Sequence, residues 1–535
     1  MVLDLNFLYQ CAGTRIHRCA GRARRPVRAS PCMLQVSIIF ELLRSQPRML
    51  FWLMTLTQTA LWWLVPSLFY SAPPGDLPIL LAVGHEFQVG SFLGPPLASW
   101  LAEIVFDIAG MPGIYLLSQA CVVVTYWAVF TLGRAIVGDM HATLAVMLMV
   151  GVAVFGLPTV EFGPSVLAMA LTALMILHFW RALGEGRRRY WLALAVDTGL
   201  LLMTSYAGLI LCLVLVGFTV ATRRGRAALG TIEPWIAGVI VVMLIFPQLI
   251  WLDATGEIAL PTLSHVLGSV VADADPLDFV RVVARVAALH GGFVLLVVLA
   301  SGWGLKRLKR VPVFLRPPVD PFAKLFVYYH AAVPLLAALV IAAVFGERSL
   351  FGGIAPLVVL FGLAVVVAAG DMVSLHRQRL LGVIWAVLLV APPIATVVAL
   401  FTAPWITGTD FQVTLPGKEV GRYFSDNFAR RTGRPLEIVA GEERIAALVA
   451  LYARPRASLY LDATPSRSPW ITQRDVASRG AVVVWPAASV AGTPPPDISA
   501  RFPGLVPDVR RTFERTVQGR APLLRVGWGI VRPQQ

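Results

Sequence analysis

The sequence predicts a polytopic α-helical membrane protein with a soluble α/β domain at its C-terminal end. Three observations lead to this fold class. Hydrophobic residues make up 57% of the 535 residues and charged residues only 14%, whereas about a quarter of an average soluble protein is charged. Apolar windows long enough to cross a bilayer recur up to residue 403. Beyond that point the composition turns polar, and strand-like and helix-like segments alternate.

The first segment, residues 1–47, is rich in arginine and lacks the charged, apolar and cleavage-site order of a secretory signal. We expect a basic, poorly ordered cytoplasmic tail. Nothing before Met33 looks structural, so Met33 is an alternative start of the chain.

The middle of the chain carries about eleven windows of roughly 20 apolar residues, the length that spans a bilayer. They lie near residues 50–70, 112–132, 141–158, 164–182, 190–205, 207–222, 233–252, 287–304, 325–345, 352–370 and 380–403. With an odd number of spans, the two ends of the membrane region lie on opposite sides of the bilayer.

The loops between these windows alternate in charge. Basic clusters fall at residues 187–189, 223–226, 306–310 and 377–379. No Lys or Arg occurs in the intervening loops at 71–111, 159–163 and 205–207. Because cytoplasmic loops accumulate basic residues, the N-terminus is expected to be cytoplasmic and everything after residue 403 external. The net charge of +15 then reflects topology rather than nucleic-acid binding, for which no aromatic–basic or zinc pattern is present.

The first external loop, residues 71–111, is rich in acid and contains Asp76, His85, Glu86, Glu103 and Asp107. Apolar residues that follow Asp76 predict a short helix along the membrane interface. Pro95 and Pro96 then precede a second helix that begins at Leu97, since proline is well tolerated in a first helical turn. These features place carboxylates at the outer membrane surface.

Asp76 after the first span, a glycine-containing turn and then Pro95-Pro96-Leu97 resemble the first external loop of family 39 glycosyltransferases. These are membrane enzymes of the GT-C type, related to protein O-mannosyltransferases and lipid A aminoarabinose transferases. The family's loop usually reads Asp-Glu and later His- or Lys-Pro-Pro-Leu. Here Leu77 replaces the Glu and Gly94 replaces the basic residue.

The resemblance implies a GT-C-like fold, with a transmembrane glycosyltransferase-like domain at residues 48–403 and a periplasmic α/β domain at 404–535. It also implies a polyprenyl-phosphate-linked sugar donor, inversion at the anomeric carbon and an acceptor on a lipid, glycan or protein. The location would be a bacterial inner membrane, and membrane lipid would be a partner. Asp76 matches the family's essential carboxylate.

Four further residues are candidates for binding the donor or the sugar. Glu161, in the second external turn, corresponds to a family position that faces the same cavity as the first loop; as a lone interfacial acid it can equally be solvated. Arg281 and Arg285 lie four apart on one helical face and can hold a lipid phosphate or simply extend to the interface. Arg348 resembles a family position near that phosphate, which guanidinium groups bind well.

A metal is not demanded by any ligand spacing. His85, Glu86 and Glu161 are the candidate ligands if a divalent metal takes part, and Glu86 is also a candidate substrate-binding residue. Because His85 and Glu86 are adjacent, they point apart on a helix, which disfavours shared ligation. Asp197, in the middle of the fifth window, is expected to have a structural partner, either Thr198 or a group on a neighbouring helix.

The last 130 residues or so read as a small α/β domain. Helical spacing predicts helices at 418–431 and 442–453. Apolar and β-branched runs predict strands at 436–439, 457–461, 481–485 and 523–531.

Together these features predict an enzyme that transfers sugar from a lipid-linked donor. Such a donor is already activated, so no nucleotide site is needed, and Asp76 can act as general base on an acceptor hydroxyl. A transporter or flippase for a lipid-linked substrate is the competing hypothesis, although no repeated halves are visible. An inactive membrane scaffold of the same fold is a third, because Leu77 and Gly94 depart from the family pattern.

Overall fold

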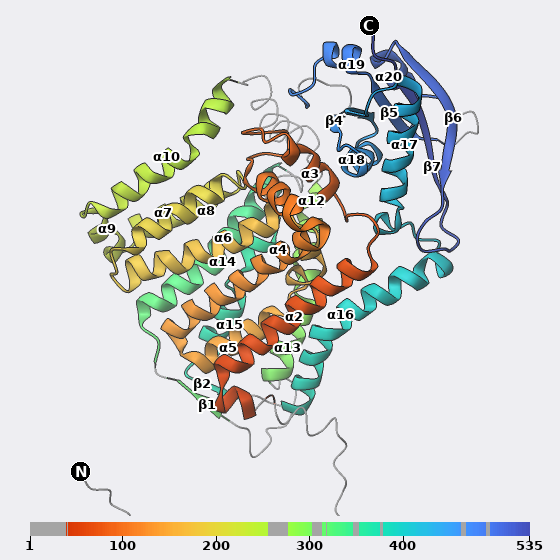
Figure 1. Ribbon diagram of the computed structural model, residues 1–535. Coiled ribbons are helices and arrows are strands. Elements are labelled where there is room, and N and C mark those ends of the chain that lie inside the picture. Colours follow the sequence, from red (N-terminus) through yellow and green to blue (C-terminus); the bar gives the residue numbers. More distant parts are fainter. Residues whose placement is uncertain are drawn as a thin grey trace, which may run out of the picture.

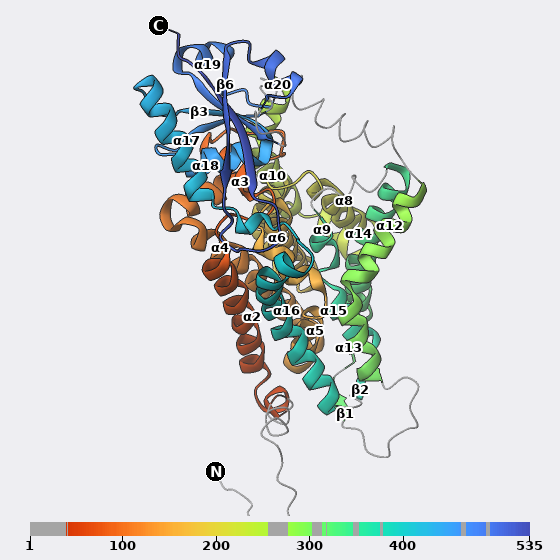
Figure 2. The same ribbon diagram turned by 90° about the vertical axis from the view of Figure 1, so that its right-hand side faces the viewer.

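The computed structural model describes residues 39, 41–254, 276–301, 313–316, 318–345, 353–374, 378–461, 467–487 and 493–534. A bundle of helices forms the larger part, and a β-sheet domain rests on the end of the bundle opposite the short strands β1 Val313–Leu315 and β2 Met372–Ser374 (Figures 1 and 2). The predicted basic tail falls almost entirely outside the described residues. The fold class expected from the sequence is confirmed.

Six described helices are long and apolar enough to cross a membrane, or up to nine if each of three bent pairs is one span. The single helices are α2 Pro47–Phe69, α4 Leu97–Val137, α6 Pro164–Phe179 with its extension η3 Trp180–Gly184, α10 Glu233–Ala254, α14 Pro321–Phe345 and α16 Gln378–Ile406. The bent pairs are α5 Asp139–Met149 with η1 Ala153–Phe155 and η2 Leu157–Val160, α8 Gly208–Ala221 with α9 Arg223–Leu229, and α12 Pro276–Leu289 with α13 Gly291–Ser301.

The expectation of about eleven spans is too high by this measure, although each predicted window coincides with an apolar helical segment. The windows at 190–205 and 352–370 correspond to α7 Tyr190–Leu202 and to η5 Ala355–Val358 with α15 Phe361–Ala368. Both segments fall in the range of 10–17 residues. A straight helix needs about 20 residues to cross the hydrocarbon core, so apolar composition alone overstated the count.

The bundle is organised around α6. Its spanning window is 83% buried, compared with 11% for α10, which packs against α7 at the edge of the bundle. Small side chains such as Ala168, Ala170 and Ala173 on α6 are buried and allow the neighbouring helices α4 and α7 to approach closely. α6 is therefore the core element of the membrane region.

The first loop forms the two expected helices. The second is the first arm of α4, which is interrupted at Gly110 just before Pro112. The first, α3 Leu77–His85, is buried from Leu77 through Gly84. It packs between α4 and helix α18 Glu443–Tyr452 of the sheet domain. The sequence of α3 is apolar on every face, so all of them can be buried.

The sheet domain contains five strands in the order β4-β3-β5-β7-β6. They are β3 Ile438–Gly441, β4 Ser458–Leu461, β5 Ala481–Pro486, β6 Leu505–Phe513 and β7 Leu524–Val531. β4, β3 and β5 run parallel to one another, whereas β7 runs antiparallel to both of its neighbours, β5 and β6. Four strands match the predicted segments. β6 was missed because it contains Pro507 and several charges and has a bulge between Asp508 and Arg511, features that only an edge strand tolerates.

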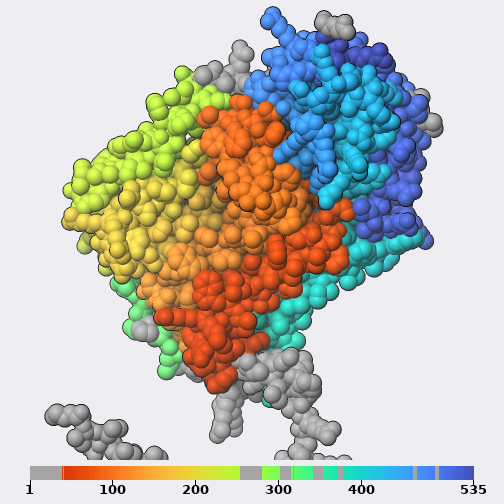
Figure 3. Space-filling model, in the orientation of Figure 1, coloured from red at the N-terminus to blue at the C-terminus, as the bar shows by residue number. Residues whose placement is uncertain are grey.

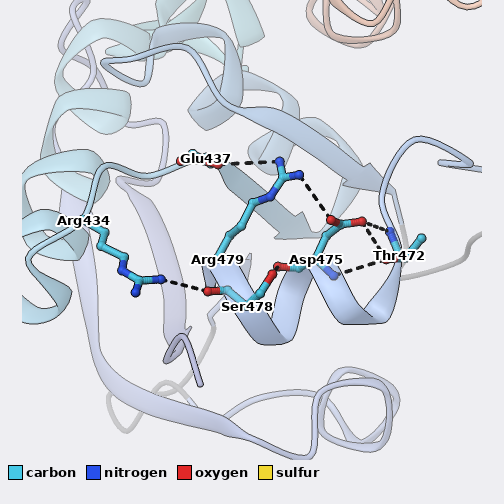
Figure 4. A network of polar contacts seen from close by, with 6 residues as sticks. All are labelled: Arg434, Glu437, Thr472, Asp475, Ser478 and Arg479. Atoms are coloured by element: carbon cyan, nitrogen blue, oxygen red, sulfur yellow. Dashed lines mark hydrogen bonds and ion pairs between the residues drawn. The ribbon is translucent and has the colours of Figure 1, made fainter. Parts of the chain in front are cut away.

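Four described helices cover the two faces of the sheet: α17 Gly417–Thr432, α18, α19 Gln473–Arg479 and α20 Pro496–Arg501. At the start of α19, Thr472 and Asp475 form a reciprocal capping box. Arg479 bonds Asp475 and also pairs with Glu437 (Figure 4). This network ties α19 to the segment before β3 without a disulfide.

The sheet domain is continuous with the first loop rather than loosely attached. Ile79 and Ala82 of α3 belong to the same buried cluster as Val420, Phe424 and Leu459 of the sheet domain. Figure 3 shows the C-terminal residues lying directly against the first-loop helices. The position of α3 is therefore set jointly by the bundle and by the domain above it.

Candidate active site

Asp76 is exposed and immediately precedes α3. Its backbone N–H donates to Oε1 of Glu161 at 2.8 Å. The preceding Gly75 has φ +52°, and a Cβ there would lie 2.1 Å from the carboxylate carbon of Glu161. Glycine is required at this position because the turn has a left-handed conformation and Glu161 packs directly on it. The first loop and the turn that carries Glu161 thus meet at Asp76, as the resemblance implied.

The other side of the Asp76 turn is held by the segment that follows α16. Nε2 of Gln412 donates to the carbonyl of Gly75 at 2.7 Å and to that of Pro73 at 3.2 Å. The next carbonyl, Val413 O, accepts from the backbone N–H groups of Ser71 and Ala72 at 2.9 and 3.2 Å. The turn is therefore hydrogen-bonded on one side by Glu161 and on the other by the segment around Gln412, more than 330 residues away in sequence.

A cavity of about 330 Å³ opens beside this turn. The described residues that line it are Asp76, Leu77, Leu80, Leu93, Val154, Pro158, Thr159, Glu161, Phe162, Gly163, Pro164, Ser165, Val166, Met169 and Ala355. Two carboxylates and two hydroxyls are the polar side chains among them, and none of these lining residues is basic. Mostly apolar walls with a few convergent polar groups are typical of a small-molecule site.

Buried polar side chains from two spans hold the floor of this cavity. Nε2 of Gln119 donates to the hydroxyl of Thr159 at 3.1 Å, and Nε2 of Gln58 donates to the carbonyl of Phe155 at 2.7 Å. Tyr126 in turn donates to Oε1 of Gln58 at 3.2 Å. The bond from Gln58 satisfies the Phe155 carbonyl at the end of η1, and the bond from Gln119 holds the Thr159 side chain of η2. Together they keep the second loop in a fixed place.

The two departures from the family pattern have local structural reasons. Leu77 is 1% exposed and packs in the first turn of α3, where a glutamate would be buried. Gly94 has φ +109° and forms an isolated bridge with Ser91, with the ring of Tyr206 3.7 Å from where a Cβ would lie. A histidine or lysine rarely adopts that backbone conformation. Both replacements fit the local geometry of this chain.

His85 belongs to a second ionic cluster, centred on Glu103. The Glu103 side chain is fully buried, and its Oε1 is 3.0 Å from Nδ1 of His85 and 2.5 Å from Nη1 of Arg456. Nη2 of Arg456 also donates to the carbonyl of Leu81 in α3 at 2.8 Å. Sequence reasoning missed Arg456. The usable signal was Glu103, an acid on the buried face of a predicted helix that required a partner.

The candidate metal ligands are not brought together. Within the described part of the chain, no three His, Cys, Asp or Glu side chains gather in a way that could hold a metal. His85 is the last residue of the nine-residue helix α3, whereas Glu161 contacts the turn before its first residue. The two lie at opposite ends of a helix about 13 Å long. Oε1 of Glu86 is buried and has no hydrogen-bond partner in the part of the chain that the structure describes. Glu86 is not among the residues that line the cavity.

The candidate phosphate-binding residues lie elsewhere. Arg281 and Arg285 are exposed on α12, which packs against α13 and α14 and stands on the side of the bundle away from α3 (Figure 2). Arg348 lies outside the described residues. The predicted phosphate site is therefore not tested by the geometry around Asp76.

Asp197 has the structural partner that was expected on a neighbouring helix. Its Oδ2 is 2.5 Å from Nδ1 of His178 on α6. The alternative partner, Thr198, instead donates its hydroxyl to the carbonyl of Leu194. The pair links α6 and α7 and does not line the cavity at Asp76.

Comparison with known proteins supports the relationship expected from the first loop. Residues 94–251 match the family model described as dolichyl-phosphate-mannose-protein mannosyltransferase. No curated protein matches the chain.

Among solved structures, ArnT from Cupriavidus metallidurans bound to undecaprenyl phosphate is similar with a TM-score of 0.53 and 12% identity, over 90% of this chain and 99% of that chain. The apo form of that protein gives a TM-score of 0.41 and 14% identity, over 90% and 98%. The oligosaccharyltransferase of Archaeoglobus fulgidus gives 0.42 and 13%, over 82% and 69%. The first of these matches shows that the chain has an ArnT-like fold, and the family match confirms the resemblance.

Proposed function

We propose that this chain, a membrane glycosyltransferase of the GT-C type, transfers a sugar from a polyprenyl-phosphate-linked donor to an acceptor hydroxyl, with Asp76 as general base. The donor class is supported by the family description and by ArnT, which was solved with undecaprenyl phosphate. The acceptor is a lipid, a glycan or a protein. Reaction takes place at the outer face of a bacterial inner membrane, with the N-terminus cytoplasmic and the sheet domain periplasmic.

The observation that carries this proposal is the convergence of Asp76 and Glu161 at one largely apolar cavity. Their roles differ. Oε1 of Glu161 accepts the Asp76 backbone N–H, and its carboxyl packs against Gly75, so Glu161 holds the turn. Within the described residues, the carboxylate of Asp76 has no hydrogen-bond or ion-pair partner. An exposed and unengaged carboxylate is available to take a proton.

In the proposed reaction, Asp76 removes the proton of the acceptor hydroxyl while its oxygen attacks the anomeric carbon. The bond between that carbon and the lipid phosphate oxygen breaks, and the phosphate departs with the bonding electron pair. General-base assistance of this kind contributes about 10²- to 10⁴-fold. No described residue that lines the cavity is basic, so the group that stabilises the phosphate is not among these residues. Arg281, Arg285 and Arg348 are the candidates from this chain.

The test is Asp76→Asn, assayed in membranes with a labelled polyprenyl-phosphate sugar. Turnover should fall about 10²- to 10⁴-fold while the protein still inserts. Asp107→Asn is the matched control, because Asp107 lies in the same loop and is 64% exposed. Unchanged turnover of Asp76→Asn would refute the assignment.

The same assay on the wild-type protein separates the competing functions. A transferase releases lipid phosphate and glycosylated acceptor. A flippase moves the labelled lipid across the bilayer without a product, and an inactive scaffold does neither. The ArnT-like fold supports the first outcome.

A further inference from the structure

We propose that Gln412 is a positioning residue for catalysis, through which the sheet domain sets the orientation of the Asp76 turn. This inference rests on the proposed role of Asp76. It gives the C-terminal domain a part in the reaction, although its strands and helices do not line the cavity.

The contacts of Gln412 are specific to the turn that carries the base. Both hydrogens of its amide nitrogen are used, one by the carbonyl of Gly75 at 2.7 Å and one by that of Pro73 at 3.2 Å. The Gly75 carbonyl belongs to the peptide bond whose N–H is that of Asp76. That N–H is held from the opposite side by Glu161. The peptide unit before Asp76 is therefore fixed at both its donor and its acceptor end.

Gln412 is itself anchored to the sheet domain. It begins the short turn η6 Gln412–Thr414, and the Thr414 side chain accepts a bond from Arg515 at 3.3 Å. Arg515, 9% exposed, also donates to the carbonyls of Phe411 and Pro522. The backbone N–H of Thr516 donates to Thr414 O at 3.0 Å. A continuous set of hydrogen bonds thus leads from the β6–β7 hairpin to the turn that carries Asp76.

Loss of the Gln412 amide should move the turn without unfolding it. The bonds from Ser71 and Ala72 to Val413 O remain, as does the contact with Glu161. What is lost is the control of one peptide plane, and with it the direction of the Asp76 side chain. A displacement of about 1 Å at a reacting group can cost as much as 10²-fold in rate.

The first test is Gln412→Met, which keeps the length of the side chain and removes its donors. We expect kcat to fall about 10- to 100-fold, with the KM for the polyprenyl-phosphate sugar and the melting temperature of the protein close to wild type. Gln473→Met is the matched control, because Gln473 is exposed on α19. Wild-type kcat in Gln412→Met, or a fall in kcat that merely parallels a fall in melting temperature, would overturn the inference.

The second test is Gln412→Glu, measured across pH. An ionised carboxylate cannot donate to the two carbonyls, whereas its protonated form can donate one hydrogen bond. The activity of this variant, divided by that of the wild type at the same pH, should therefore rise as the pH falls. A structural defect predicts a constant or falling ratio, which would count against a positioning role.

The two proposals fail in different ways. If Asp76→Asn is fully active, the proposed function is wrong. If Asp76→Asn is inactive while Gln412→Met turns over like the wild type, only the positioning role is wrong. In the double variant, Gln412→Met should add no further loss to that of Asp76→Asn, because there is no longer a base to orient. A further loss that simply multiplies with the first would refute the inference.

Discussion

Replacement of Arg456 by methionine should destabilise the contact between the sheet domain and the first loop. Arg456 is 15% exposed and pairs with the fully buried Glu103 at 2.5 Å. Removing one partner of a buried ion pair costs about 3–5 kcal/mol, since the remaining charge stays buried. Among the described residues, Oε2 of Glu103 already lacks a hydrogen-bond partner. His85, at 3.0 Å and 38% exposed, compensates only when it is protonated.

A second loss adds to the first. Nη2 of Arg456 also donates to the carbonyl of Leu81, a bond that contributes about 1 kcal/mol. Because Leu81 lies in the buried helix α3, the effect acts on the element that follows Asp76. We therefore expect Arg456→Met to lower the melting temperature by several degrees and to make the domain more sensitive to protease.

The assay is thermal melting and limited proteolysis of the purified protein in detergent. Arg454→Met is the matched control, because Arg454 is exposed and only two residues away. If the penalty arises from the unpaired charge, the double variant Arg456→Met/Glu103→Gln should recover part of the lost stability. Equal melting of the two arginine variants, or no recovery in the double variant, would refute this reasoning.

Two further predictions concern single contacts. Glu161→Gln keeps an oxygen that can accept the N–H of Asp76, so its initial rate should exceed that of Glu161→Ala by about five- to tenfold, the worth of one hydrogen bond; equal rates would contradict a holding role. The hydroxyl and the backbone N–H of Thr472 both donate to Asp475 and, with a smaller contribution from Arg479, lower the pKa of its carboxyl (Figure 4). Thr472→Ala removes the hydroxyl bond, the largest of these causes, and keeps the backbone one. Because the pKa of Asp475 is lower in the folded protein than its unfolded value of about 4, the ionised carboxylate stabilises the fold at pH values above that value. This stability is lost as the pH falls through the folded pKa. Thr472→Ala should therefore cost about 1 kcal/mol at neutral pH, and the difference in melting temperature should shrink in acid; a pH-independent difference would contradict this.

Much of the architecture is readable from local sequence. Apolar run length located most of the described helices of the bundle, and period and composition located four of the five described strands of the sheet domain. Local sequence was less informative where burial was decided by neighbours. The sequence of α3 does not show that Ile79 and Ala82 pack into the core of the sheet domain. β6 carries Pro507 and charges that are acceptable only because it lies at an edge.

The candidate site shows the same division. Asp76 could be singled out because it lies between an apolar span and a Pro-Pro-Leu segment, and Glu161 because it is an acid at the head of another span. Nothing in the local sequence around Gln412 or Arg456 marks either residue, since each acts on a partner more than 330 residues away.

The sequence by itself determined that this chain is a membrane protein with a polar C-terminal domain, and it identified Asp76 as the candidate carboxylate. Both follow from local properties: the length of apolar runs, the asymmetry of charge between loops and a short motif. Only the tertiary structure decided what surrounds that carboxylate. Two arrangements depend on how distant segments pack: the hydrogen bonds that Glu161 and Gln412 make to the Asp76 turn, and the buried ion pair of Glu103 and Arg456. Hydrogen bonds and ion pairs act over a few ångströms in space, and separation along the chain does not report that distance.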